Sequence, residues 1–136
     1  MGIVMLIALA PAATGAIKIA KIRFNPPGPD TPITNAKLNA EWISIKNTGN
    51  SAVQLNGWRV RDRAGNVFKI GSLALPGGAA VRIHTGSGLD SFPNHLYWGR
   101  SKYVWNNNAD SATLRRPNGR VADRCSYSGG GSAVTC

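Results

Sequence analysis

The chain alternates apolar and polar residues over short runs, and turn-forming Gly, Asn, Pro and Asp separate these runs. Alternation with a period of two is typical of strands that bury one face. The run AIKIAKIRF, residues 16–24, shows it with a one-residue slip near Ala20 and Lys21, which predicts a β-bulge. The proline-rich segment 25–40 is predicted to be a loop, because proline is excluded from central strands.

The same pattern predicts short strands along the rest of the chain. Asn56 and Gly57 form a typical hairpin turn signal, and the last strands are predicted to pair as a hairpin across residues 116–119. About seven to nine short antiparallel strands at this spacing predict an all-β, single-domain β-sandwich. The further strands are expected at 41–47, 52–55, 58–63, 67–70, 80–85, 111–115 and 120–127. The residues expected to form its core include Ile43, Ile45, Trp58, Trp105 and Leu114.

The N-terminal segment is apolar or small throughout residues 3–13 and is followed by Thr14, Gly15 and Ala16. This length is too short to span a bilayer but suits the apolar region of a secretory signal. We expect residues 1–16 to be a signal peptide, and the protein to be secreted to the extracellular space or the cell envelope. No Lys or Arg precedes Ile3, so the printed sequence is expected to begin inside the signal. A buried N-terminal strand or helix is the alternative.

Two cysteines, Cys125 and Cys136, lie near the C-terminus. In a secreted chain an even count of this kind predicts one disulfide that closes a short loop. We expect the sandwich domain to cover residues 17–127, and the Gly- and Ser-rich segment 128–136 to be a tail held only by that disulfide. One cysteine pair and two scattered histidines lack the ligand spacing of a zinc site, and no cofactor is expected.

The charge is strongly one-sided, because 16 Lys and Arg stand against 6 Asp and Glu for a net charge of +10. Such a field favours anionic partners, among them nucleic acid, acidic polysaccharide and anionic membrane surfaces. Trp42 and Tyr103 would add base stacking if they were exposed. The alternative is that the basic positions are only solvated strand faces. The candidate anionic-ligand residues are Arg59, Arg61, Arg63, Arg82, Arg115, Arg116, Arg120 and Arg124.

Three stretches of the chain resemble the lamin tail domain: EWISIKNTGNSAVQLNGWRVRDRAGN, LALPGGAAVRIHTGSG and LYWGRSKYVWNNNADSATLRRPNGRVAD. The resemblance runs from about residue 17 to residue 127. It implies an immunoglobulin-like β-sandwich with a non-catalytic role. In lamins this domain is associated with chromatin and protein partners, and it also occurs in secreted bacterial proteins, where the ligand is generally unassigned. Ser44 departs from the bacterial pattern, which often has an acidic residue there, so a ligand contact through that acid would be missing.

The titratable residues show no catalytic spacing. Hydrolysis by paired carboxylates needs two acids at a defined separation, and a serine nucleophile needs a positioned base. No Gly-x-Ser-x-Gly elbow is present, and GSGLDS at residues 86–91 lacks the following Lys-Ser/Thr of a phosphate loop. We therefore expect no enzymatic activity. The acid–base residues considered are Asp30, Glu41, Asp62, Asp90, Asp110, Asp123, His84 and His95.

The segment WNNNAD, residues 105–110, is predicted to be a structural turn. Asp110 is expected to accept hydrogen bonds from turn amides, and His84 to be solvated on the outer side of its strand. The asparagines at 106–108 are expected to supply side-chain caps and left-handed backbone, with Trp105 packed beneath them.

The leading hypothesis is a secreted, non-catalytic binding module of lamin-tail type. It would engage anionic polymers, either nucleic acid or acidic wall polymers, through a basic strand face. The alternative is a protein-interaction or cell-surface assembly module without nucleic-acid binding. Neither hypothesis requires a small-molecule cofactor, and membrane contact is expected only through the signal.

Overall fold

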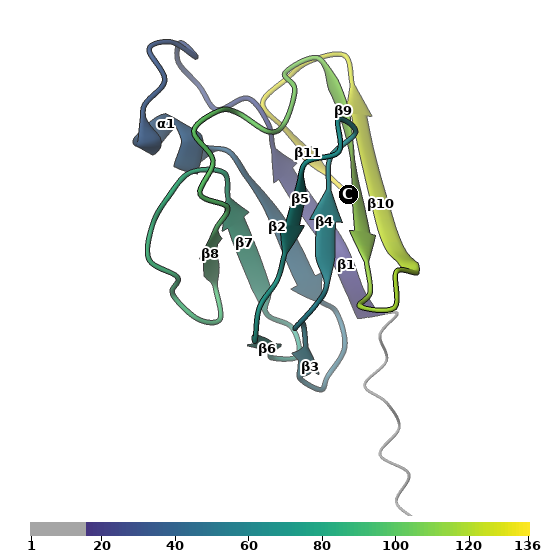
Figure 1. Cartoon of the computed structure of the whole chain (residues 1–136). Coiled ribbons are helices and arrows are strands. Elements are labelled where there is room, and N and C mark those ends of the chain that lie inside the picture. Colours follow the sequence, from purple (N-terminus) through teal and green to yellow (C-terminus); the bar gives the residue numbers. More distant parts are fainter. Residues whose placement is uncertain (1–15) are drawn as a thin grey trace, which may run out of the picture.

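Two β-sheets face each other in the computed structural model, which describes residues 16–136 (Figure 1). Residues 1–15 of the predicted signal peptide lie outside the described part of the chain. The elements are β1 (Ile17–Arg23), α1 (Asn35–Ala40), β2 (Trp42–Asn47), β3 (Val53–Gln54), β4 (Arg59–Arg61), β5 (Val67–Lys69), β6 (Ala74–Leu75), β7 (Ala80–His84), β8 (His95–Tyr97), β9 (Ala109–Arg115), β10 (Val121–Ser128) and β11 (Ala133–Thr135).

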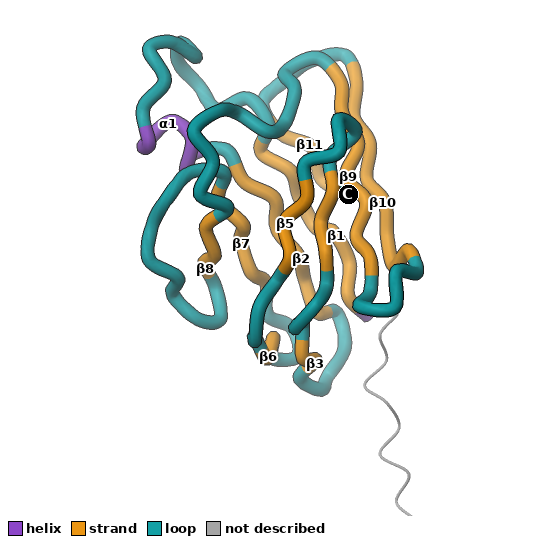
Figure 2. The backbone as a smooth tube through the Cα atoms, in the orientation of Figure 1, coloured by secondary structure: helices purple, strands orange, loops and turns teal. Residues whose placement is uncertain are grey.

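The strands form two layers, with the loops gathered mainly at the ends (Figure 2). One layer is a five-stranded sheet with the order β11-β1-β2-β7-β8, and the other is a four-stranded sheet with the order β10-β9-β4-β5. Strands β3 and β6 pair separately at one end of the molecule. All described pairs are antiparallel except β7 and β8, which run parallel. The predicted all-β sandwich is confirmed.

The predicted bulge in β1 is present. Ile19 pairs with Ile45 of β2, and the next pair joins Lys21 to Ser44, so that Ala20 is the extra residue. A one-residue insertion reverses the alternation of the strand. As a result, Ile19 before the bulge and Ile22 after it are both buried in the core, while Lys21 points outward.

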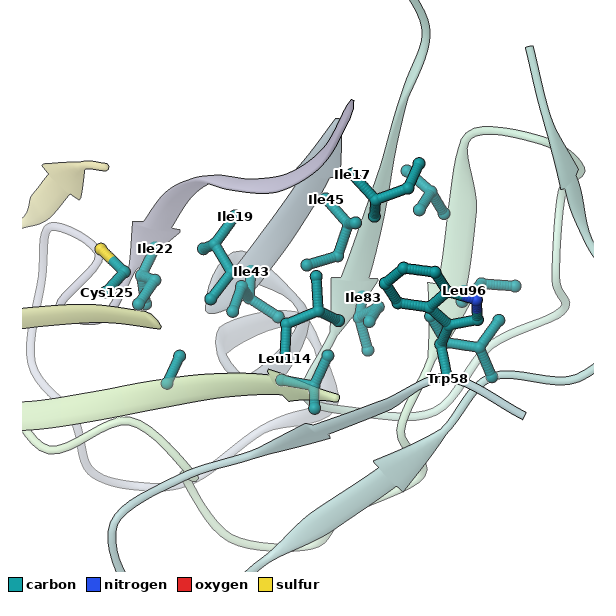
Figure 3. Close-up of a cluster of buried hydrophobic side chains, with 14 of the residues drawn as sticks. Ile17, Ile19, Ile22, Ile43, Ile45, Trp58, Ile83, Leu96, Leu114 and Cys125 are labelled. Atoms are coloured by element: carbon teal, nitrogen blue, oxygen red, sulfur yellow. The ribbon is translucent and has the colours of Figure 1, made fainter. Parts of the chain in front are cut away.

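The core lies between the two sheets, as the close-up of the buried side chains shows (Figure 3). Isoleucines of β1, β2 and β7 contribute one side of it, and Leu114 of β9 and Cys125 of β10 contribute the other. The residues expected in the core, Ile43, Ile45, Trp58, Trp105 and Leu114, are each at most 3% exposed.

The segment predicted to be a proline-rich loop contains the short helix α1. Its N-cap is Thr34, whose Oγ1 accepts a hydrogen bond from the backbone N–H of Lys37 at 3.2 Å. Such a cap satisfies an amide that has no partner within the helix. Leu38 is the buried residue of the helix and anchors it to the sandwich. The loop prediction is therefore wrong for residues 35–40.

The C-terminal segment differs from the expected tail. Strand β10 continues to Ser128, and β11 pairs with β1, with Val134 opposite Ile22. The predicted disulfide between Cys125 and Cys136 is confirmed. Because β10 belongs to the four-stranded sheet and Cys136 follows β11 of the five-stranded sheet, this disulfide links the two layers.

The Asn56-Gly57 turn does not close a hairpin. Strand β3 pairs with β6, whereas β4 pairs with β5 and β9, so the turn carries the chain from the small sheet into the four-stranded one. Gly57 has a φ of 86°, the left-handed conformation that the sequence signal indicates. The signal thus identified the turn correctly but not the strands that pair.

Candidate anionic-ligand surface

Five cations lie on the outward side of the four-stranded sheet. Arg59 of β4 is directly opposite Arg115 of β9 on one side and Lys69 of β5 on the other. One step along the sheet, Arg61 and Arg124 are both opposite Thr113. Residues opposite one another in an antiparallel ladder project from the same face. We call this set the basic sheet face; it comprises Arg59, Arg61, Lys69, Arg115 and Arg124.

The fold brings together four of the arginines that the sequence proposed as candidates, namely Arg59, Arg61, Arg115 and Arg124. Arg63 lies two residues beyond the end of β4 and is also exposed. Lys69 was missed by the sequence reasoning. Its position between the inward residues Phe68 and Ile70 marks it as outward, but its nearness to Arg59 depends on the β4–β5 hairpin.

Arg116 and Arg120 belong to the turn between β9 and β10, not to the sheet face. The Arg116 amide donates to the Arg120 carbonyl at 2.9 Å, which closes the hairpin. The Arg116 side chain is half-buried and borders a hollow shared with Trp58 at the end of the sandwich. Arg115 is tied to the same turn, because its Nη1 donates to the Gly119 carbonyl at 2.9 Å. Arg120 is exposed.

Arg82 lies on the opposite side of the molecule, on β7 of the five-stranded sheet. Its guanidinium carbon is 4.2 Å from the centroid of the Trp42 ring, a cation–π contact. Trp42 is only 6% exposed, so it does not offer the free face that base stacking would require. Tyr103 is half-buried, and its hydroxyl donates to the Asp30 carbonyl at 2.9 Å.

The carboxylates lie in the interior, in the loops or, for Asp123, at the gap between the two sheets, which leaves the outer sheet faces basic. Glu41, Asp62 and Asp110 are buried. Asp123, on β10, accepts a hydrogen bond from the Ile19 amide of β1 at 2.8 Å and so joins the two sheets. Asp30 and Asp90 lie in loops. None of the outward positions on the described strands therefore carries an acid that would neutralise the arginines.

Asp110 organises the turn that contains the three asparagines. Its Oδ1 accepts from the amides of Arg63 at 3.0 Å and Ser111 at 2.8 Å, and its Oδ2 accepts from the Asn106 amide at 3.1 Å. The expected structural role of Asp110 is confirmed by these bonds. The expectation of left-handed asparagines is wrong, because among residues 16–136 only glycines have positive φ.

Glu41 is a fully buried carboxyl group at the start of β2. Its Oε1 accepts hydrogen bonds from the Thr85 hydroxyl at 2.7 Å and from the amides of Val104 at 2.8 Å and Trp105 at 3.2 Å. Burial raises the pKa of Glu41 to about 7, although these hydrogen bonds oppose the shift. The residue therefore anchors the 98–108 segment to the sheet and has no access to a ligand.

His84 and His95 form a hydrogen-bonded pair, so His84 is not the solvated residue that was expected. His84 Nδ1 is 2.8 Å from the Asn39 carbonyl oxygen, and its Nε2 is 2.9 Å from His95 Nδ1. A carbonyl can only accept, so His84 Nδ1 carries the hydrogen and, in a neutral His84, Nε2 accepts from His95. Burial lowers the pKa of His84, which favours this neutral form. Within residues 16–136 no group of three or more His, Cys, Asp or Glu is placed to hold a metal ion.

These two facing sheets, closed at one side by a disulfide, define an immunoglobulin-like β-sandwich. The sequence model of the Lamin Tail Domain matches residues 10–129, and the chain belongs to this family. Its members are immunoglobulin-like, non-enzymatic domains, and the family indicates a binding or interaction module. No curated protein matches the chain. Across residues 16–136, none of the helices has the length and apolar character needed to cross a membrane.

Proposed function

We propose that this protein is a secreted, non-catalytic binding module that engages anionic polymers, either nucleic acid or acidic wall polymers, through the basic sheet face. One observation supports the proposal most directly. Lys69, Arg59 and Arg115 stand side by side on three neighbouring strands, and the outward positions of that sheet carry no acid.

The electrostatics of this row favour a polyanion. Neighbouring strands are about 5 Å apart, and two unit charges at that distance in water repel by about 1 kcal/mol. A phosphate or sulfate group placed over the row replaces repulsion with attraction at several cations at once. Contacts of this kind do not depend on sequence, and they weaken as salt concentration rises.

Charge reversal tests the proposal with a matched control. The test variant is R59E/R61E, on the four-stranded sheet. The control is K18E/K46E, which reverses two exposed cations that are directly opposite each other on β1 and β2 of the other sheet. We expect R59E/R61E to elute from DNA and heparin columns at much lower salt than the wild type. The elution salt of the control should fall less. Absence of retention of the wild type at low salt would overturn the proposal.

A second candidate function, protein interaction, is favoured by the loop between β7 and β8. Leu89 and Phe92 are 92% and 62% exposed. The loop that carries them is held in place, because Ser87 exchanges hydrogen bonds with Asn35 at 2.8 and 2.9 Å. Exposed apolar patches mark protein contact sites, and these two side chains are the most exposed large apolar ones among residues 16–136. If this function is correct, L89S/F92S would abolish the capture of an envelope protein by this chain, and the salt concentration would have little effect on capture by the wild type.

A further inference from the structure

A hollow of about 400 Å³ lies on the outer face of the five-stranded sheet, on the opposite side of the molecule from the basic sheet face. It involves β1, β2, β7 and the start of β8. The residues that line it include Lys21, Trp42, Ser44, Arg82, Asn94 and His95. Lys21 and Arg82 are cations. The side chains of Ser44, Asn94 and His95 can donate or accept hydrogen bonds.

The strand register places the polar residues of the hollow in one row. Lys21 is opposite Ser44, Ser44 is opposite Arg82, and Arg82 is opposite His95. The bulge at Ala20 is necessary for this row, because in a regular strand Lys21 would lie on the same buried side as Ile19. The row therefore presents an ammonium, a hydroxyl, a guanidinium and an imidazole across four neighbouring strands.

The Arg82 guanidinium is held in a fixed orientation. It lies over the Trp42 ring at 4.2 Å, and Trp42 is itself buried in the sheet surface. A stacked guanidinium presents its N–H donors around its edge in the planar fork that matches two oxygens of a phosphate or sulfate. Because the contact with the ring already restricts the side chain, less conformational entropy is lost when an anion binds.

We infer that this hollow binds a single tetrahedral oxyanion group, phosphate or sulfate. The edge of the Arg82 guanidinium is its main donor, Lys21 supplies the second positive charge and the Ser44 hydroxyl a further hydrogen bond. The Ser44 hydroxyl is held only by a 3.5 Å contact to the Lys21 carbonyl, so it is free to turn toward an anion. The hollow is larger than one such anion, which leaves room for the sugar or polyol that carries it. The site is distinct from the basic sheet face, because it lies on the other sheet.

Titration of the ¹⁵N-labelled protein with sodium phosphate and with sodium sulfate, at ionic strength held constant with NaCl, tests this inference. We expect saturable shifts of the Ser44, Arg82 and His95 amides and of the Trp42 indole N–H, with dissociation constants on the order of millimolar. R82Q should weaken binding by about tenfold, because a charge-assisted bidentate contact is lost. R82K should fall between the wild type and R82Q, because an ammonium keeps the charge without the planar fork.

The matched control is K18Q, which removes an exposed cation of the same sheet outside the hollow. It should bind phosphate as the wild type does. Shifts that rise linearly without saturation, or equal weakening in R82Q and K18Q, would overturn the inference. R59E/R61E should leave the phosphate titration unchanged, so the outcome does not depend on the polymer proposal. Glycerol 3-phosphate as a second probe identifies the source of the group: tighter binding than inorganic phosphate indicates an esterified ligand, and equal binding indicates the free ion.

Discussion

Arg59 and Arg115 stand directly opposite each other on the antiparallel strands β4 and β9, with Lys69 on the other side of Arg59. Like charges at opposed positions of a sheet destabilise it. The row therefore opposes folding when no ligand is bound, and a bound polyanion relieves the repulsion. Removal of the positive charge of Arg59 should therefore stabilise the protein when no anion is bound.

Replacement of Arg59 by Thr, a good strand former, should raise the free energy of unfolding at low salt by roughly 0.2–1 kcal/mol, because two like-charge contacts disappear. The gain should shrink at 1 M salt, where the Debye length is about 3 Å. Urea denaturation of the wild type and of R59T at both salt concentrations measures this difference in the free energy of unfolding. R63T is the control, since Arg63 lies beyond the end of β4. A loss of stability that is equal at both salt concentrations would show that the aliphatic stem of Arg59 matters more than its charge.

Asp110→Asn should lower the free energy of unfolding by about 1–3 kcal/mol. The side chain is buried and accepts from the amides of Arg63, Asn106 and Ser111. In the Asp110→Asn variant an NH₂ group replaces one carboxylate oxygen and faces backbone N–H donors instead of accepting from them. A buried donor left without an acceptor destabilises the fold by about 1–3 kcal/mol. Thermal and urea unfolding give the value. If Asp110 were instead a catalytic residue, the variant would lose a hydrolytic activity without losing stability.

Glu41 should make stability depend on pH. Its pKa is raised from 4.5 to about 7 by burial, so the folded state holds a proton that the unfolded state releases. The free energy of unfolding should therefore fall as the pH rises from about 4.5 to about 7, by about 3 kcal/mol, and stay level above that.

E41Q is the matched control for this pH dependence, because its amide oxygen can keep the three acceptor contacts but does not titrate. The difference in free energy of unfolding between the wild type and E41Q should follow the same fall between pH 4.5 and 7. Parallel pH profiles of the two proteins would contradict the assignment.

The disulfide between Cys125 and Cys136 closes a loop with a sequence separation of 11. In the chain-entropy model such a loop stabilises the folded state by about 3 kcal/mol. C125A/C136A should lose stability of that order, and hydrogen exchange should show the largest loss of protection in β11 and its partner β1. Intact mass after alkylation without reductant shows directly whether the Cys125–Cys136 disulfide has formed. Two alkylatable thiols in the purified protein would contradict it.

The sequence predicted those features that depend on local pattern. The alternation around Trp58 and Val60 located β4, the slip at Ala20 located the bulge, and Asn118-Gly119 located the last hairpin turn. Each of these signals lies within a few adjacent residues, where the period of the side chains or the turn chemistry decides the structure.

Other features depend on contacts between distant segments. Helix α1 spans six residues with one buried side chain, too few for a helical period to appear. Strand β11 follows three glycines and is a strand only because β1 offers its edge. The candidate site also depends on distant segments. The alternation of the sequence predicts that the arginines point outward, but only the strand order places Arg59 beside Arg115 and puts Arg82 on the other sheet. Trp42 shows the same dependence on a distant segment, because the Arg82 guanidinium of β7 lies over its ring.

The salt dependence of duplex DNA binding tests the central claim most directly. With up to five cations on the basic sheet face, the logarithm of the binding constant should fall against the logarithm of salt concentration with a slope of about −3 to −4.5. R59E/R61E should flatten this slope by about 2 or more, and K18E/K46E should leave it close to the wild-type value. A wild-type slope near zero, or equal flattening in both variants, would contradict recognition of anionic polymers by this face.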